Sequence, residues 1–157
     1  MPIVRNSFIQ MSKLPNVKGR ISYISSKARQ ENLYAVYETT DRKFWRELAM
    51  CNQEEFRKSG TKGICIEARE LIIALPESFV DYEPDKLLKL FTEHFKQNYG
   101  VECISALHHN KRKTNYHIHL IFSERKLLDE PVEKIATRNM FYQSGILYHS
   151  SWSFLSG

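Results

Sequence analysis

The stretch ALHHNKRKTNYHIHLIFSER, residues 106–125, decides the fold of this chain. Two strand-like runs, Val101–His109 and Tyr116–Ser123, lie on either side of a short polar segment, and this spacing predicts an antiparallel hairpin. Along the second run apolar residues alternate with His117 and His119, and successive side chains of a strand point to opposite faces. We therefore expect the apolar face to pack in the core and the two histidines to face outward.

A third histidine, from the first run, reaches the same face if the loop consists of residues 110–115. His108 then pairs with His117 at a Cβ separation of about 5 Å. A register shifted by one residue would bring His109 onto the histidine face instead, and would turn Glu102 toward the core. Because burial of Glu102 disfavours the shifted register, His108 is the preferred third histidine and His109 remains the alternative.

Three neutral imidazoles at hairpin distance can bind one divalent ion through nitrogen, with bonds of about 2 Å, and leave coordination positions open for a substrate oxygen. His108, His117 and His119 are therefore the candidate metal ligands. The cysteines, in contrast, are widely spaced and form no C-x-x-C pair, so neither a disulfide framework nor a cysteine zinc site is predicted.

The rest of the sequence predicts further elements around the hairpin. Asp41 suits the cap of a helix, Pro76 suits the end of a strand, and Gly100 suits the end of a second helix. The expected elements, in chain order, are a strand at 3–10, a flexible approach at 15–19, a short segment at 20–28, a helix that Asp41 caps and Ser59-Gly60 closes, a strand at 64–75 and a helix from Pro84 to Gly100.

Length and charge restrict the class of protein. A chain of 157 residues can bury a core of its own, so we expect a single domain over residues 1–157. The net charge of +5 favours an anionic partner such as nucleic acid. No run approaches the length needed to span a bilayer and the N-terminus lacks the apolar run of a signal peptide, which predicts a cytoplasmic protein without membrane insertion.

The histidine stretch closely resembles the histidine motif of MobA/MobL-type (MobQ-like) relaxases, members of the HUH endonuclease group that nick and transfer single-stranded DNA. The resemblance continues through NLYAVYETTDRKFW (32–45), CNQEEFRKSG (51–60) and EARELIIALPESF (67–79), and covers most of residues 3–142. Members of the family usually continue well past this point, so the resemblance implies a C-terminal truncation after about residue 142.

For the fold, the resemblance implies an α+β, ferredoxin-like (HUH) core with a central antiparallel sheet and helices packed on one face. For the chemistry, it implies that Tyr23 is the nucleophile, that His108, His117 and His119 bind a divalent metal, magnesium or manganese, and that Glu70 is an acidic residue near the site. Attack by tyrosine would join the 5′ phosphate to the protein and release a 3′ hydroxyl, without ATP.

The resemblance also implies a function in plasmid mobilisation and conjugation, at the single-stranded DNA of an origin of transfer, together with accessory mobilisation and coupling proteins. Basic residues on both sides of Tyr23 and in the hairpin loop are natural contacts for DNA phosphates. These candidate contacts are Arg20, Lys27, Arg29, Lys111, Arg112 and Lys113.

Three other functions remain open at this point. Replication initiators and some transposases of the HUH group place the tyrosine after the histidines, where this chain has Tyr142 and Tyr148. A non-catalytic remnant would bind single-stranded DNA without nicking it. A small metal hydrolase of another class would turn over phosphoesters without any tyrosine adduct.

Overall fold

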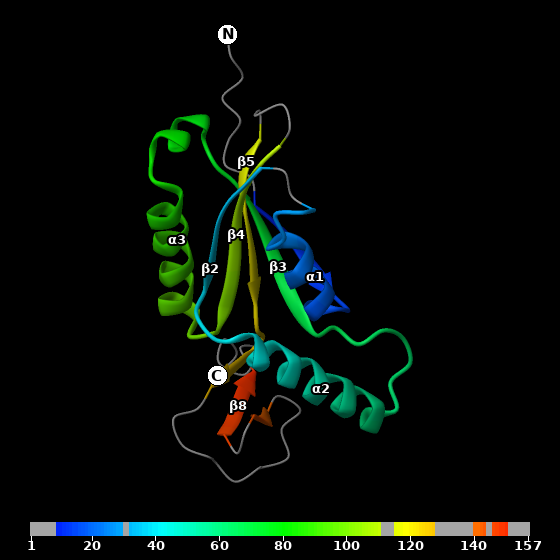
Figure 1. Ribbon diagram of the computed structural model, residues 1–157. Coiled ribbons are helices and arrows are strands. Elements are labelled where there is room, and N and C mark those ends of the chain that lie inside the picture. The colour runs from blue at the N-terminus through cyan, green and yellow to red at the C-terminus, as the bar shows by residue number, and fades with distance from the viewer. Residues whose placement is uncertain (1–8, 30–31, 111–114, 128–139, 144–145, 151–157) are drawn as a thin grey trace.

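The structure is a computed structural model that describes residues 9–29, 32–110, 115–127, 140–143 and 146–150. Its centre is a five-stranded antiparallel sheet in the order β1-β3-β5-β4-β2 (Figure 1). The strands are β1 (Ile9–Leu14), β2 (Leu33–Glu38), β3 (Ala68–Ala74), β4 (Cys103–His109) and β5 (Tyr116–Phe122). The helices are α1 (Val17–Ile24), α2 (Arg42–Ser59) and α3 (Pro84–Tyr99), with a 3-10 turn, η1 (Glu77–Asp81). The predicted α+β class and its ferredoxin-like central antiparallel sheet are confirmed.

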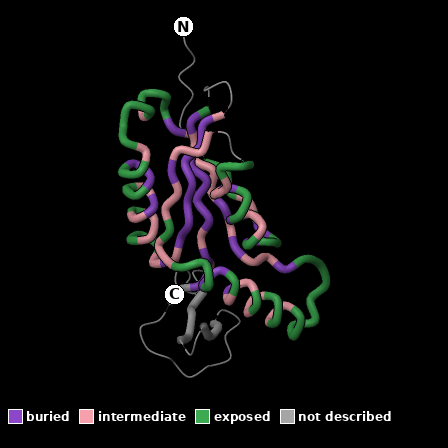
Figure 2. Tube along the Cα trace, viewed as in Figure 1, coloured by how far each residue is buried: buried purple, intermediate pink, exposed green. Residues whose placement is uncertain are grey.

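The helices lie on both faces of the sheet, and not on one face as expected. Ile104 and Ala106 of β4 pack in one core cluster with α1 and α2, whereas Cys103 and Leu107 of the same strand pack in a second cluster with α3. Every residue of β4 is buried, and Figure 2 shows the central strands buried while the outer sides of the helices are exposed. A central strand that is apolar on both sides needs cover on both sides.

The helix boundaries follow the predicted signals. The side chain of Asp41 accepts a hydrogen bond from the backbone N–H of Phe44 at 3.0 Å, so Asp41 caps α2. Gly60 and Gly100 end α2 and α3 with φ of 68° and 66°, in the left-handed region that glycine tolerates. Pro84 occupies the first position of α3, where its missing N–H costs nothing.

The N-terminal expectations need correction. The predicted first strand at 3–10 falls partly outside the described residues, and β1 extends to Leu14. The expectation of a flexible segment at 15–19 is wrong, because α1 already begins at Val17. Asn16 caps this helix by accepting a hydrogen bond from the backbone N–H of Gly19 at 3.0 Å. The predicted strand at 64–75 begins only at Ala68, because its partner strand β1 ends opposite that residue at Leu14.

A second, three-stranded sheet follows the hairpin in the order β6-β8-β7. Its strands are β6 (Arg125–Leu127), β7 (Met140–Gln143) and β8 (Ile146–Ser150). The sequence did not predict it, because strands of three to five residues are too short to display a period. Arg125 connects the start of this sheet to α2 through an ion pair with Glu55.

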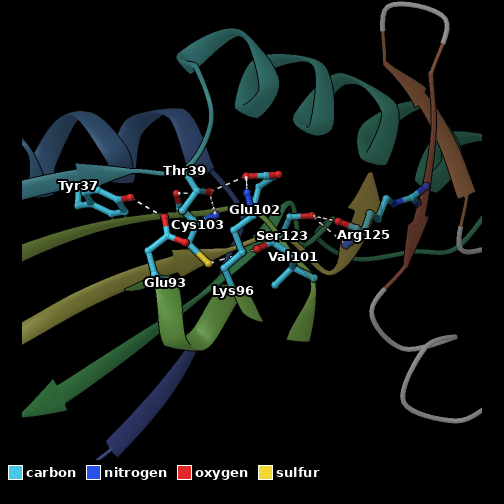
Figure 3. A network of polar contacts seen from close by, with 9 residues as sticks. All are labelled: Tyr37, Thr39, Glu93, Lys96, Val101, Glu102, Cys103, Ser123 and Arg125. Carbon is cyan, nitrogen blue, oxygen red and sulfur yellow. Dashed lines mark hydrogen bonds and ion pairs between the residues drawn. The ribbon is translucent and has the colours of Figure 1, made fainter. Parts of the chain in front are cut away.

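Polar contacts connect α3 to the edge of the large sheet (Figure 3). Glu102, just before β4, accepts hydrogen bonds from the hydroxyl of Thr39 at 2.6 Å and from Nζ of Lys96 at 3.1 Å. One turn earlier on α3, Glu93 accepts a hydrogen bond from the hydroxyl of Tyr37 at 2.5 Å. Glu102 thus lies immediately before the first residue of β4, with both a hydroxyl and a cation beside it.

Among the described residues, every helix is too short or too polar to cross a membrane.

Candidate metal centre

Three histidines from the hairpin converge on one face of the sheet. His108 of β4 lies opposite His117 of β5, as the sequence predicted, and His119 follows two residues further along β5. One ring nitrogen from each of the three lies within 4.8 Å of the others, and Nε2 of His117 is 2.9 Å from Nε2 of His119. His109 pairs with Tyr116 and packs on the opposite face, so the shifted register does not occur.

Each of these histidines has its second ring nitrogen beside an oxygen acceptor. Nε2 of His108 is 2.8 Å from the carbonyl oxygen of Ile24, and Nδ1 of His117 is 2.9 Å from the carbonyl oxygen of Asn115. Nδ1 of His119 is 3.5 Å from Oε2 of Glu70. At His108 and His117 the hydrogen-bonded acceptor favours the tautomer that carries its proton there, which leaves the lone pair of the other nitrogen for a metal. At His119 the carboxylate lies at ion-pair distance, and Nδ1 makes no hydrogen bond within the described residues.

The histidine face does not point outward as expected, because α1 covers part of it. His108 is 3% exposed and His119 is 8% exposed, and the last residue of α1 supplies the carbonyl that His108 contacts. Burial lowers the pKa of His108 to about 4, although its hydrogen bond to Ile24 acts in the opposite direction. Burial also lowers the pKa of His117. Both rings are therefore neutral near pH 7, as metal ligands must be.

A buried carboxylate lies directly behind His119. Glu70 of β3 is 1% exposed and accepts hydrogen bonds from Arg20 at 2.9 Å (Nε to Oε2), 2.9 Å (Nη2 to Oε1) and 3.2 Å (Nε to Oε1). Burial alone would raise the pKa of Glu70, but the contacts with His119 and Arg20 outweigh burial and lower it. Glu70 is thus held ionised between a guanidinium and an imidazole.

Tyr23 lies on α1, beside the residues that contact the histidine cluster. Its side chain is 43% exposed, and Arg20 lies one turn earlier with its guanidinium carbon 5.1 Å from the centre of the Tyr23 ring. Ile24, which contacts His108 through its carbonyl, is the next residue. The eight residues of α1 therefore bring together an exposed phenol, a contact to a histidine and the partner of Glu70.

The predicted DNA contacts have different surroundings. Arg20 is directed at Glu70, whereas Lys27 and Arg29 are exposed in the turn after α1. Lys111, Arg112 and Lys113 lie outside the described residues.

The alternative tyrosines can also be placed in part. Tyr116 is 1% exposed and belongs to the core cluster under α3, away from the histidine cluster. Tyr142 and Tyr148 belong to β7 and β8, but their side chains are outside the described part of the structure.

The family resemblance had placed Glu70 near the site, but the sequence did not predict the contacts of the histidines with Ile24 and Asn115 or the pairing of Arg20 with Glu70. The carbonyls of Ile24 and Asn115 carry no side-chain signal, and Arg20 is 50 residues away from its partner Glu70. The alternation of side chains along β3 carried a signal for Glu70. Glu70 lies two positions from Ile72 and therefore on the same face of β3, and Ile72 is the residue opposite His119.

Comparison with known proteins gives one family. A model described as the MobA/MobL family matches residues 25–146, a span that includes Glu70 and the three histidines. Arg20 and Tyr23 lie just before the matched span. No curated protein matches the chain.

Proposed function

This chain belongs to the MobA/MobL family of mobilisation relaxases, and from that membership we propose that it nicks one strand of DNA at an origin of transfer. The observation that carries the proposal is the convergence of His108, His117 and His119 on one face of the sheet, beside the helix that bears an exposed tyrosine. We further propose that it acts in the cytoplasm with accessory mobilisation and coupling proteins.

The histidine cluster fits a divalent ion, and we propose magnesium or manganese, although three imidazoles also accept other divalent metals. Its three rings supply nitrogen ligands within 4.8 Å of one another, and each ring has an oxygen acceptor near its second nitrogen. A bound ion would polarise the scissile phosphate and stabilise the charge that develops on it during attack. His108, His117 and His119 would hold that ion.

In the proposed reaction Tyr23 is the nucleophile. Its phenolic oxygen attacks the scissile phosphorus as the hydroxyl loses its proton, and a phosphotyrosyl ester forms with the 5′ phosphate. The bond from phosphorus to the 3′ oxygen breaks, and that oxygen takes up a proton to become a free hydroxyl. One phosphoester replaces another, so the reverse reaction can rejoin the strand without ATP.

Glu70 and Arg20 act in this scheme as positioning residues. Glu70 is buried and receives three hydrogen bonds from Arg20, so its contact at 3.5 Å orients the ring of His119. The guanidinium of Arg20 lies 5.1 Å from the centre of the Tyr23 ring while it holds Glu70. Arg20 thereby connects the nucleophile to the histidine cluster through two contacts.

The experiment that tests the proposal is a search for a protein–DNA adduct that survives denaturation. The protein is incubated with manganese and labelled single-stranded origin DNA, and the adduct is mapped to a residue. Tyr23→Phe should abolish the adduct and retain DNA binding, whereas Tyr99→Phe should retain both. Tyr99 is a matched control, because its side chain is also 43% exposed but lies at the end of α3.

Other outcomes identify the other functions. Persistence of the adduct in Tyr23→Phe would overturn the assignment of the nucleophile, and its loss in Tyr142→Phe would favour an initiator or a transposase. Binding to single-stranded DNA that weakens with salt, without an adduct in either metal, would favour a non-catalytic remnant.

A further inference from the structure

A pocket of about 190 Å³ lies between α1 and α2. Each helix contributes three residues at the spacing i, i+3, i+4, which places them on one helical face. The lining residues are Lys18, Ile21 and Ser22 from α1 and Arg42, Trp45 and Arg46 from α2. The two faces oppose one another and form a groove between the helices.

The lining is basic and contains no acid. Arg42 pairs with Glu38, which does not line the pocket, and its Nη2 is 3.4 Å from the hydroxyl oxygen of Ser25. Neither Lys18 nor Arg46 has an ion-pair partner within the described ranges of the chain. Three cations around one small space, two of them uncompensated, attract an anion.

The floor of the pocket favours a phosphate over a base. Ile21 is 3% exposed and Trp45 is 1% exposed, so the indole offers no open ring face on which a base could stack. Nε1 of Trp45 is buried and has no hydrogen-bond partner in the described part of the chain. That nitrogen has almost no exposed surface, so the attraction of the pocket for an anion depends on the cations around it.

We propose that this pocket binds one backbone phosphate of the single-stranded DNA, close to the nucleotide that reaches Tyr23. The proposal rests on the proposed function. Ser22 lines the pocket and precedes Tyr23 on α1, so a strand that crosses α1 can contact both. Lys18 and Arg46 neutralise the phosphate, and the hydroxyl of Ser22 donates to it.

The test measures DNA affinity in the absence of divalent metal, so that binding is separated from cleavage. Fluorescence anisotropy with a labelled oligothymidylate compares the full chain with Lys18→Ala, Arg46→Ala and the double variant. The control is Lys43→Ala, which removes the same charge from α2 outside the pocket, where Lys43 pairs with Glu47. Circular dichroism and thermal melting confirm that every variant is folded.

We expect the double variant to bind DNA on the order of tenfold more weakly than the unchanged chain. The slope of log affinity against log salt concentration should become shallower by about 0.7 for each phosphate that is no longer neutralised. Lys43→Ala should stay within about twofold of the unchanged chain, because an exposed paired lysine contributes little.

Several results would overturn the proposal. The proposal is wrong if the pocket variants bind DNA as tightly as Lys43→Ala does. It is also wrong if the pocket variants lose affinity for inorganic phosphate but keep their affinity for DNA. The adduct assay separates the two proposals. Loss of affinity in the pocket variants without any adduct in the unchanged chain contradicts the proposed function alone, and an adduct with unchanged affinity in the pocket variants contradicts the pocket alone.

Discussion

Replacement of Arg20 by alanine should leave Glu70 ionised, buried and without its main partner. Glu70 is 1% exposed, and the three hydrogen bonds at 2.9–3.2 Å from Arg20 would disappear together. Removal of one partner from a buried ion pair costs about 3–5 kcal/mol. Because 30% of the Arg20 side chain is exposed and water can enter the space left, we expect the lower end, about 3 kcal/mol.

A double-mutant cycle separates this charge effect from the loss of packing. Glu70→Gln removes the charge, so it should cost only about 1–2 kcal/mol. In the double variant, Arg20→Ala/Glu70→Gln, no carboxylate is left uncompensated. The two losses should therefore fail to add, with a coupling of at least about 1 kcal/mol.

The assay is urea denaturation of the metal-free protein at pH 7, followed by circular dichroism, with thermal melting as a second measurement. For a chain of 157 residues each kcal/mol corresponds to about 2–4 °C, so Arg20→Ala should melt about 6–12 °C lower. Strict additivity of the two single losses, or a loss below about 1 kcal/mol for Arg20→Ala, would refute the reasoning.

The same pair predicts the direction of a pH dependence. The pKa of Glu70 is lowered in the folded protein, so its ionised form stabilises the fold above the ordinary pKa of a glutamate. That contribution declines as the pH falls through the folded pKa. In Arg20→Ala the burial of Glu70 is less well compensated, so its pKa should rise and the acid-sensitive range should begin at higher pH.

Three further predictions concern other parts of the molecule. His108→Ala should weaken manganese binding, measured by calorimetry, at least about tenfold. His109→Ala should change that binding by less than about twofold, because His109 lies on the opposite face of β4 from the histidine cluster. Equal losses in the two variants would contradict the observed register. Asp41→Ala should lower the unfolding free energy by about 1 kcal/mol in urea through loss of the α2 cap. Cys103 is fully buried and burial raises its pKa, so iodoacetamide should modify the half-buried Cys51 first and Cys103 only after denaturation, as peptide mass spectrometry would show.

The hairpin could be predicted from sequence because its information is local. The alternation of side chains along a strand placed His117 and His119 on one face and Tyr116 on the other. The length of the loop then placed His108 opposite His117. The caps of α2 and α3 were predictable for the same reason, because Asp41 and Gly100 act on residues within one turn.

The surroundings of the hairpin could not be predicted in the same way, because they depend on contacts between distant segments. Glu70 reaches His119 only because β3 pairs with β5, and a chain pattern does not specify which strands become neighbours. The helices on both faces follow from β4 being apolar on both sides, whereas the sequence-based expectation had placed helices on one face only. The cover of α1 over His108 similarly required a contact across 84 residues.

The shortness of α1 has a consequence for how this protein can be altered. Its eight residues carry the exposed phenol, the contact to His108, the tether to Glu70 and one wall of the pocket, on different sides of two turns. A single inserted residue would rotate everything after it by about 100° and shift it by about 1.5 Å. Engineering of α1 should therefore tolerate substitutions one at a time far better than any change of length, and an insertion-scanning library should show α1 as a sharply intolerant segment.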